Sequence, residues 1–118
     1  MLQQNTRLRR QAVGLATALV GVAILWATLT PRALPDTGAV PLDKIAHATA
    51  FFLLILPSAW GYPKALIVTV PFALLLGGAI ELLQPLVGRG REMADFIMDV
   101  AGVGIGLVVG AGLRQVRN

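Results

Sequence analysis

The sequence contains no cysteine. This absence excludes disulfides, thiolate metal sites and cysteine nucleophiles. Only 6% of the residues are aromatic, 14% are charged, and a single histidine is present. The ten basic residues are spread over the expected loops and chain ends, and no basic patch with interleaved aromatic residues occurs. We therefore expect no nucleic-acid partner.

Apolar residues make up 56% of the 118 residues, and the mean hydropathy is +0.74, well above the range of soluble domains. Four apolar segments each approach the ~20 residues that a helix needs to cross a bilayer. We expect transmembrane helices at residues 12–30, 44–60, 63–87 and 95–113. No repeat or linker interrupts them. The sequence therefore predicts an all-α, integral membrane four-helix transmembrane bundle, forming a single domain over residues 1–118.

The first apolar segment follows the basic residues Arg7, Arg9 and Arg10. Its apolar run is longer than that of a signal peptide, and no typical cleavage site follows it, so we expect an uncleaved anchor. Short basic segments stay in the cytoplasm under the positive-inside rule. With four crossings we predict that both termini are cytoplasmic, and the inverted topology is the alternative.

Pro57 and Pro85 fall within the expected helices, and each should disturb its helix. Pro57 should kink or fray the far end of the second helix. The ring of Pro85 should collide with the carbonyl group of Glu81 and kink the outer end of the third helix.

Polar residues gather near one end of three expected helices. Because successive helices alternate in direction, these residues should meet in the same outer third of the bilayer; they are Asp43, Lys44, His47, Glu81, Gln84, Asp95 and Asp99. An ionised side chain in the hydrocarbon costs at least ~2.5 to 3.5 kcal/mol, so such groups usually face partners. We predict that His47 lies within side-chain reach of Glu81 or Asp99, and that Arg89 folds over an acid of this cluster.

Helix spacing places both aspartates of the fourth segment on one stripe with three glycines. Asp95, Asp99, Gly102, Gly106 and Gly110 follow one another at steps of three or four residues. Glycines at such spacing allow close helix packing in membranes, so this stripe should face the bundle interior. Small residues on other helices are candidate partners for it: Gly14, Ala18, Gly21, Gly77 and Gly78.

The motifs "DKIAH" from Asp43, "ELLQ" from Glu81, "GR" ahead of Asp95, and D-x-x-x-D-x-x-G-x-x-x-G occur in this order. Together they resemble the VanZ-like family of small bacterial membrane proteins over about residues 41–110. The motif positions are taken by Asp43, Lys44, His47, Glu81, Gln84, Arg89, Asp95, Gly102 and Gly106. Asp99 departs from the family pattern, where asparagine is common, and adds an acid to the site.

The resemblance implies a multi-pass protein of the bacterial cytoplasmic (inner) membrane. It links the chain to the cell envelope and to antibiotic resistance, because the namesake of the family is associated with resistance to the glycopeptide teicoplanin. The short loops offer no domain that would bind a bulky antibiotic. A site at headgroup depth suits an amphiphile or a lipid-linked envelope precursor better.

Three classes of function remain open. The first is binding of an anionic lipid or lipid-linked precursor, with phosphate contacted by Lys44, Arg89 and Arg91 and the site completed by Asp43, Gln84 and Asp95. The second is an intramembrane hydrolase or transferase with His47, Glu81 and Asp99 in acid and base roles. The third is a structural subunit whose polar cluster only locks the bundle.

A divalent ion held by His47, Glu81 and Asp99 is a weaker alternative, because one histidine is thin evidence for a metal site. We therefore predict no metal site and no cofactor from the sequence. No oligomeric state is predicted.

Overall fold

The computed structural model describes residues 1–30, 42–88 and 93–117. These residues form four long α-helices and two short 3-10 helices. The long helices are α1 (Leu2–Leu29), α2 (Leu42–Gly61), α3 (Leu66–Leu83) and α4 (Met93–Arg117). The short helix η1 (Pro63–Ala65) leads into α3, and η2 (Gln84–Val87) follows it.

Helices are expected because a spanning segment has to satisfy its own backbone hydrogen bonds where water is absent. Four spans are long and apolar enough to cross a membrane: Leu2–Leu29, Leu42–Gly61, Pro63–Val87 and Met93–Arg117. Many large apolar side chains also point outwards, among them Leu75 and Val108, which are 74% and 73% exposed. Such a surface suits lipid rather than water. The all-α four-helix transmembrane bundle predicted from the sequence is confirmed.

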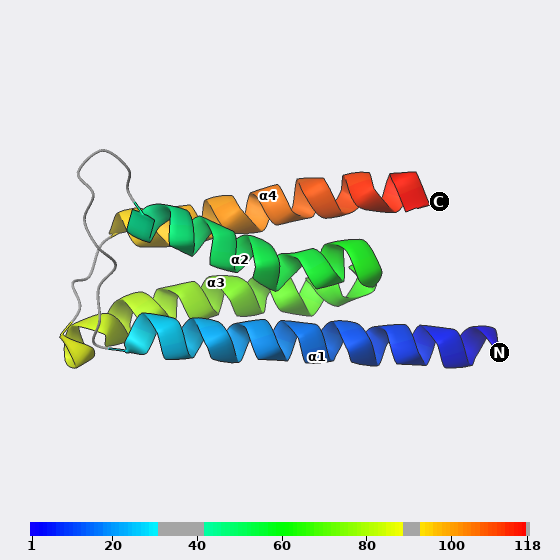
Figure 1. Ribbon diagram of the computed structural model, residues 1–118, viewed down its shortest axis with the longest axis horizontal. Helices are drawn as coiled ribbons and strands as arrows, with labels where there is room; N and C mark the ends of the chain where they lie inside the picture. The colour runs from blue at the N-terminus through cyan, green and yellow to red at the C-terminus, as the bar shows by residue number, and fades with distance from the viewer. Residues whose placement is uncertain (31–41, 89–92, 118) are drawn as a thin grey trace.

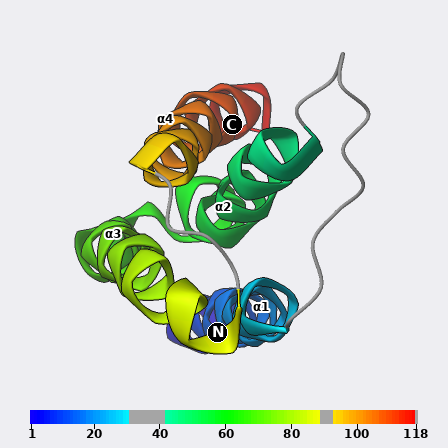
Figure 2. The ribbon, with the colours of Figure 1, turned by 90° about the vertical axis from the view of Figure 1, so that its left-hand side faces the viewer.

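The four helices run alternately up and down, as Figure 1 shows. The two chain ends lie at one end of the bundle, together with the turn from α2 into α3 (Figure 1). The first turns of α2 and α4 and the helix η2 lie at the other end, which we call the distal end (Figure 1). Viewed from the distal end in Figure 2, α2 lies side by side with α4.

The apolar core lies around α2, which contacts each of the other three helices and packs most extensively against α4. Phe51, Leu54 and Ile55 of α2 are at most 1% exposed. They belong to a buried cluster that α1, α3 and α4 complete with Ile24, Ala73, Leu76, Ile80 and Val103. This core holds α2 in the centre of the bundle, and therefore fixes the position of the polar residues in its first turns.

The helix boundaries differ from the expected ones mainly at the two ends of the chain. α1 begins at Leu2 rather than at residue 12, and α4 continues to Arg117 rather than ending at residue 113. Hydropathy marks only the part of a helix that fits the hydrocarbon. The polar residues beyond it contain no proline or other strong helix breaker, so the helices continue past the apolar segments.

Pro57 and Pro85 affect their helices differently. α2 continues through Pro57 to Gly61, so the far end of this helix is not frayed. Near Pro85 the α-helix ends at Leu83 and gives way to the 3-10 helix η2, as expected where proline removes a hydrogen-bond donor. Gly88 then ends this segment with φ of 79°, a conformation that residues with a side chain rarely adopt.

The glycine stripe of α4 is buried, as predicted, and it packs against the backbone of α2. A Cβ atom on Gly102 would collide with the carbonyl oxygen of Ala48. A Cβ atom on Gly106 would lie 3.2 Å from the carbonyl oxygen of Phe52, and one on Gly110 would lie 2.9 Å from the carbonyl carbon of Ala59. These contacts make α2 and α4 the most closely packed helix pair of the bundle.

The glycines of this stripe do not pack against the glycines singled out in the sequence. A Cβ atom added to Gly14 or Gly78 would have no neighbour within 4 Å, and one added to Gly21 would make ordinary contacts with Phe72 and Leu54. Gly77 does face α4, but at Asp99 rather than at the glycines. The prediction was wrong for Gly14, Gly21 and Gly78, because small size shows where helices can approach closely but not which pair does so.

Candidate functional site at the distal end

The predicted polar residues of α2 and α4 meet at the distal end around His47. This residue lies five positions after the start of α2, roughly 7 Å along the helix axis. Its Nδ1 atom is 2.6 Å from Oδ1 of Asp99, which lies in the second turn of α4. Both residues are buried, with exposures of 4% and 1%. The prediction that His47 reaches Glu81 or Asp99 is therefore confirmed.

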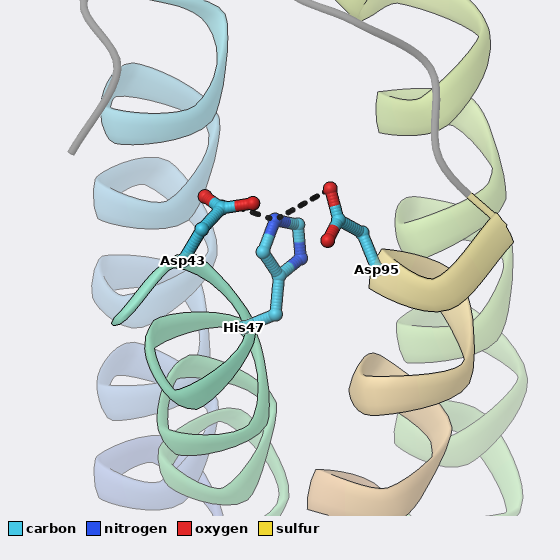
Figure 3. Close-up of side chains that lie close together, drawn as sticks. All are labelled: Asp43, His47 and Asp95. Carbon is cyan, nitrogen blue, oxygen red and sulfur yellow. Dashed lines mark ion pairs between the residues drawn. The ribbon is translucent and has the colours of Figure 1, made fainter. Parts of the chain in front are cut away.

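The other ring nitrogen of His47 faces two more carboxylates. Nε2 is 3.7 Å from Oδ2 of Asp95 and 4.0 Å from Oδ1 of Asp43. Figure 3 shows the imidazole ring between these two aspartates, with the same nitrogen directed towards both. Asp43 and His47 share one face of α2 because they are four residues apart. Both distances exceed that of a hydrogen bond, so the three groups are adjacent without being directly bonded.

Lys44 connects the cluster to the surface. Its Nζ atom donates a hydrogen bond to Oδ1 of Asp95 at 3.2 Å, and the side chain of Lys44 is 30% exposed. Asp95 is itself almost completely buried. Asp95 thus offers one oxygen to Lys44 and directs the other towards His47. This pair places a cationic group at the rim of a largely buried acidic cluster.

Glu81 brings the third helix into the cluster. His47, Glu81 and Asp99 each present one nitrogen or oxygen atom that could bind a metal, and these three atoms lie within 4.8 Å of one another. The same is true of Asp43, His47 and Asp95. His47 is thus shared by a deep triad, whose three members are buried, and an outer triad, which includes the half-buried Asp43.

A glycine of α3 makes room for Asp99. A Cβ atom on Gly77 would lie 3.0 Å from Oδ2 of Asp99. Within the residues that the structure describes, this oxygen has no hydrogen-bond partner. The sequence reasoning treated Gly77 only as a site of helix packing, and its small size was the one available signal for this contact.

Gln84 is buried near the same end, but its side-chain amide group bonds to another helix. Its Nε2 atom donates to the backbone carbonyl of Thr28 in the last turn of α1, at 3.2 Å. The last carbonyl groups of a helix lack partners within the helix, so Gln84 caps α1. This role was missed from the sequence, because nothing in it indicates which helix end Gln84 approaches.

Arg89 and Arg91, the two predicted phosphate ligands that follow α3, lie outside the described residues. The expectation that Arg89 folds over an acid therefore stays a prediction. Of the other proposed site residues, the structure brings Asp43, Lys44, His47, Glu81, Asp95 and Asp99 together at the distal end. Gln84 lies in η2, also at the distal end (Figure 1).

The arrangement fixes how His47 presents its two nitrogens. An ionised carboxylate only accepts hydrogen bonds, so Nδ1 donates to Asp99 when that acid is ionised. Nε2 is then the atom that remains for a proton or another cation, and it faces Asp43 and Asp95. The cluster is therefore built to hold positive charge at Nε2, or to accept and release a proton there.

No family model, curated protein or solved structure matches this chain.

Proposed function

We propose that this chain is a VanZ-like membrane protein whose distal polar cluster binds the headgroup of an anionic lipid or a lipid-linked cell-envelope component. The observation that carries the proposal is the position of Lys44. Its side chain, which is 30% exposed, sits at the rim of the buried cluster in the first turn of α2. That depth corresponds to the headgroup region when α2 spans the bilayer.

The surroundings of the cluster suit a molecule with both a polar head and apolar chains. Exposed apolar side chains adjoin the distal end on four helical segments, α2, α3, η2 and α4, and these are Leu42, Ile45, Leu82, Leu86 and Met93. An amphiphile can place its headgroup against Lys44 while its chains remain on the apolar surface. A soluble anion has no apolar chains that would contact this surface.

Binding of an anionic lipid in detergent micelles provides the test. We expect the purified protein to retain phosphatidylglycerol in preference to phosphatidylcholine when the complexes are measured by native mass spectrometry. Lys44→Gln should weaken this preference about tenfold, because a hydrogen bond to a charged group contributes about 1.5 kcal/mol or more. Lys64→Gln is the matched control, since Lys64 is an exposed lysine of η1 at the opposite end (Figure 1). Equal losses in both variants would show non-specific attraction by surface charge.

A second function is supported by the short contact between His47 and Asp99. A carboxylate that orients a histidine is a common arrangement for a general base, and Glu81 lies close enough to serve as a second acid or base. These residues would make the chain an intramembrane hydrolase or transferase. Turnover of a labelled lipid phosphate by the wild type, lost in Asp99→Asn, would favour the enzyme over the binding protein.

A purely structural role of the cluster predicts a different result. If the cluster only locks α2 to α4, Lys44→Gln and Asp99→Asn should change thermal stability while leaving the lipid preference intact.

A further inference from the structure

We propose that Asp43, His47 and Asp95 form a binding site for one divalent transition-metal ion of the Zn²⁺ type. The starting observation is the Nε2 atom of His47. The side chain of His47 is 3% exposed, yet this nitrogen faces two carboxylate oxygens at 3.7 and 4.0 Å, too far for direct hydrogen bonds. A ring nitrogen that faces two carboxylates at ion-pair distance without hydrogen-bonding to either leaves room for a cation shared by all three groups.

The spacing fits a metal ion with a small adjustment. Ligand atoms about 2.1 Å from a zinc ion lie roughly 3.0 to 3.5 Å from one another, depending on the coordination angle. The two distances from Nε2 exceed this range by a few tenths of an ångström. Asp43 lies at the start of α2 and its side chain is 37% exposed, so it can move inwards. The same exposed side chain provides a path for the ion to enter.

Asp99 supports the assignment of Nε2 as a ligand. Histidines that bind metals usually donate the other ring nitrogen to a carboxylate, which orients the ring and increases its basicity. Asp99 stands in this position, 2.6 Å from Nδ1. Asp99 thus acts as a positioning residue and leaves Nε2 to the metal. Lys44 holds Oδ1 of Asp95 in a similar way and leaves Oδ2 directed towards the site.

The outer triad is a better site than the deep triad of His47, Glu81 and Asp99. A metal in the deep triad would use Nδ1 or displace its hydrogen bond to Asp99. All three residues there are also buried, whereas Asp43 is half-buried and opens the outer triad to solution. Imidazole with carboxylates favours zinc and its neighbours over calcium or magnesium, which prefer oxygen ligands alone.

A bound ion would also explain how an acidic cluster can receive an anionic headgroup. The described cluster contains four carboxylates against Lys44 and His47. A divalent ion with three protein ligands keeps open positions, and a phosphate oxygen can occupy one of them. This role of the ion rests on the proposed function, whereas binding of the ion itself does not.

Zinc binding by the tag-free full-length chain in detergent, without added lipid, tests the site. We expect isothermal titration with Zn²⁺ to give one ion per chain, with a measured heat that differs between buffers of different ionisation enthalpy because binding releases protons. Asp43→Asn should lower the affinity at least about tenfold, and Asp99→Asn about ten- to a hundredfold through the orientation of His47. Lys64→Gln should leave it unchanged. Circular dichroism establishes that each variant is folded, and Asp43→Asn alters a partly exposed side chain of similar size.

Glu81→Gln distinguishes the two triads. The outer site predicts that this variant binds Zn²⁺ as the wild type does, while Asp43→Asn binds it at least about tenfold more weakly. Loss of zinc binding in Glu81→Gln with retention in Asp43→Asn would overturn the proposal in favour of the deep triad, and no stoichiometric binding by the wild type would overturn it altogether.

Measuring lipid binding with and without the ion distinguishes the metal site from the proposed function. Phosphatidylglycerol retention is measured with Zn²⁺ and with EDTA. Retention that falls in EDTA supports both proposals, whereas retention unaffected by EDTA supports the lipid site and removes the role of the ion there. Zinc binding without any lipid preference leaves the metal site standing and refutes the proposed function.

Discussion

Gly102→Ala should destabilise the bundle although it adds only one methyl group. The new Cβ would meet the carbonyl oxygen of Ala48, and would lie 3.0 Å from its carbonyl carbon and 3.1 Å from its Cα. Carbon atoms pack best at about 3.5 to 4.0 Å. Both contacting segments are helix backbone, so no side chain can rotate away. α4 therefore has to move by roughly 1 Å to restore normal contact distances, because the carbonyl oxygen lies even closer than the two carbon atoms.

The expected size of the effect follows from two opposing contributions. Overpacking costs about 1 to 3 kcal/mol, and rigid backbone on both sides favours the upper value. Replacing glycine by alanine within a helix contributes up to about 1 kcal/mol in the opposite direction. The net loss is about 2 kcal/mol, or about a thirtyfold change in the unfolding equilibrium. The shift would also strain the hydrogen bond between His47 and Asp99, since His47 directly precedes Ala48.

Gly104→Ala is the matched control, because a Cβ atom on Gly104 would have no neighbour within 4 Å. It should stabilise the protein by up to about 1 kcal/mol through helix propensity alone. The free energy of unfolding in detergent, followed by circular dichroism during denaturant titration, measures both variants. If Gly102→Ala proves as stable as Gly104→Ala, the close packing of α4 on α2 is wrong.

Three further predictions concern the buried pair, the cap of α1 and the topology. His47→Leu should lower the free energy of unfolding by about 3 kcal/mol, because the buried Asp99 loses its partner. The double variant with Asp99→Leu should be less destabilised, and a double-mutant cycle of unfolding free energies measures the difference. Gln84→Leu should cost about 1 kcal/mol by removing the hydrogen bond to the Thr28 carbonyl, and amide exchange should then increase at the end of α1. A reporter that works only in the cytoplasm should be active when fused to the C-terminus, because Arg7, Arg9 and Arg10 favour a cytoplasmic N-terminus and four crossings bring the chain back to the same side. Activity of only an extracytoplasmic reporter would show the inverted topology.

The sequence by itself determined the fold class and the end of the bundle at which the polar residues gather. Length and hydropathy fix the number of spans, because the bilayer requires about 20 apolar residues for each. Alternation of helix direction then places the start of α2, the end of α3 and the start of α4 at one end. Helical spacing also identified the buried stripe of α4, since residues three and four apart share a face.

Only the tertiary structure decided which helices touch and which atoms meet. The glycines of α4 could have packed against any helix with small residues, and the structure selects α2 through Ala48 and Ala59. That choice sets the rotation of both helices about their axes. The rotation turns one ring nitrogen of His47 towards Asp99 and the other towards Asp43 and Asp95. Spacing along a single helix carries no information about contacts across helices, so the two faces of His47 became distinct only in the folded bundle.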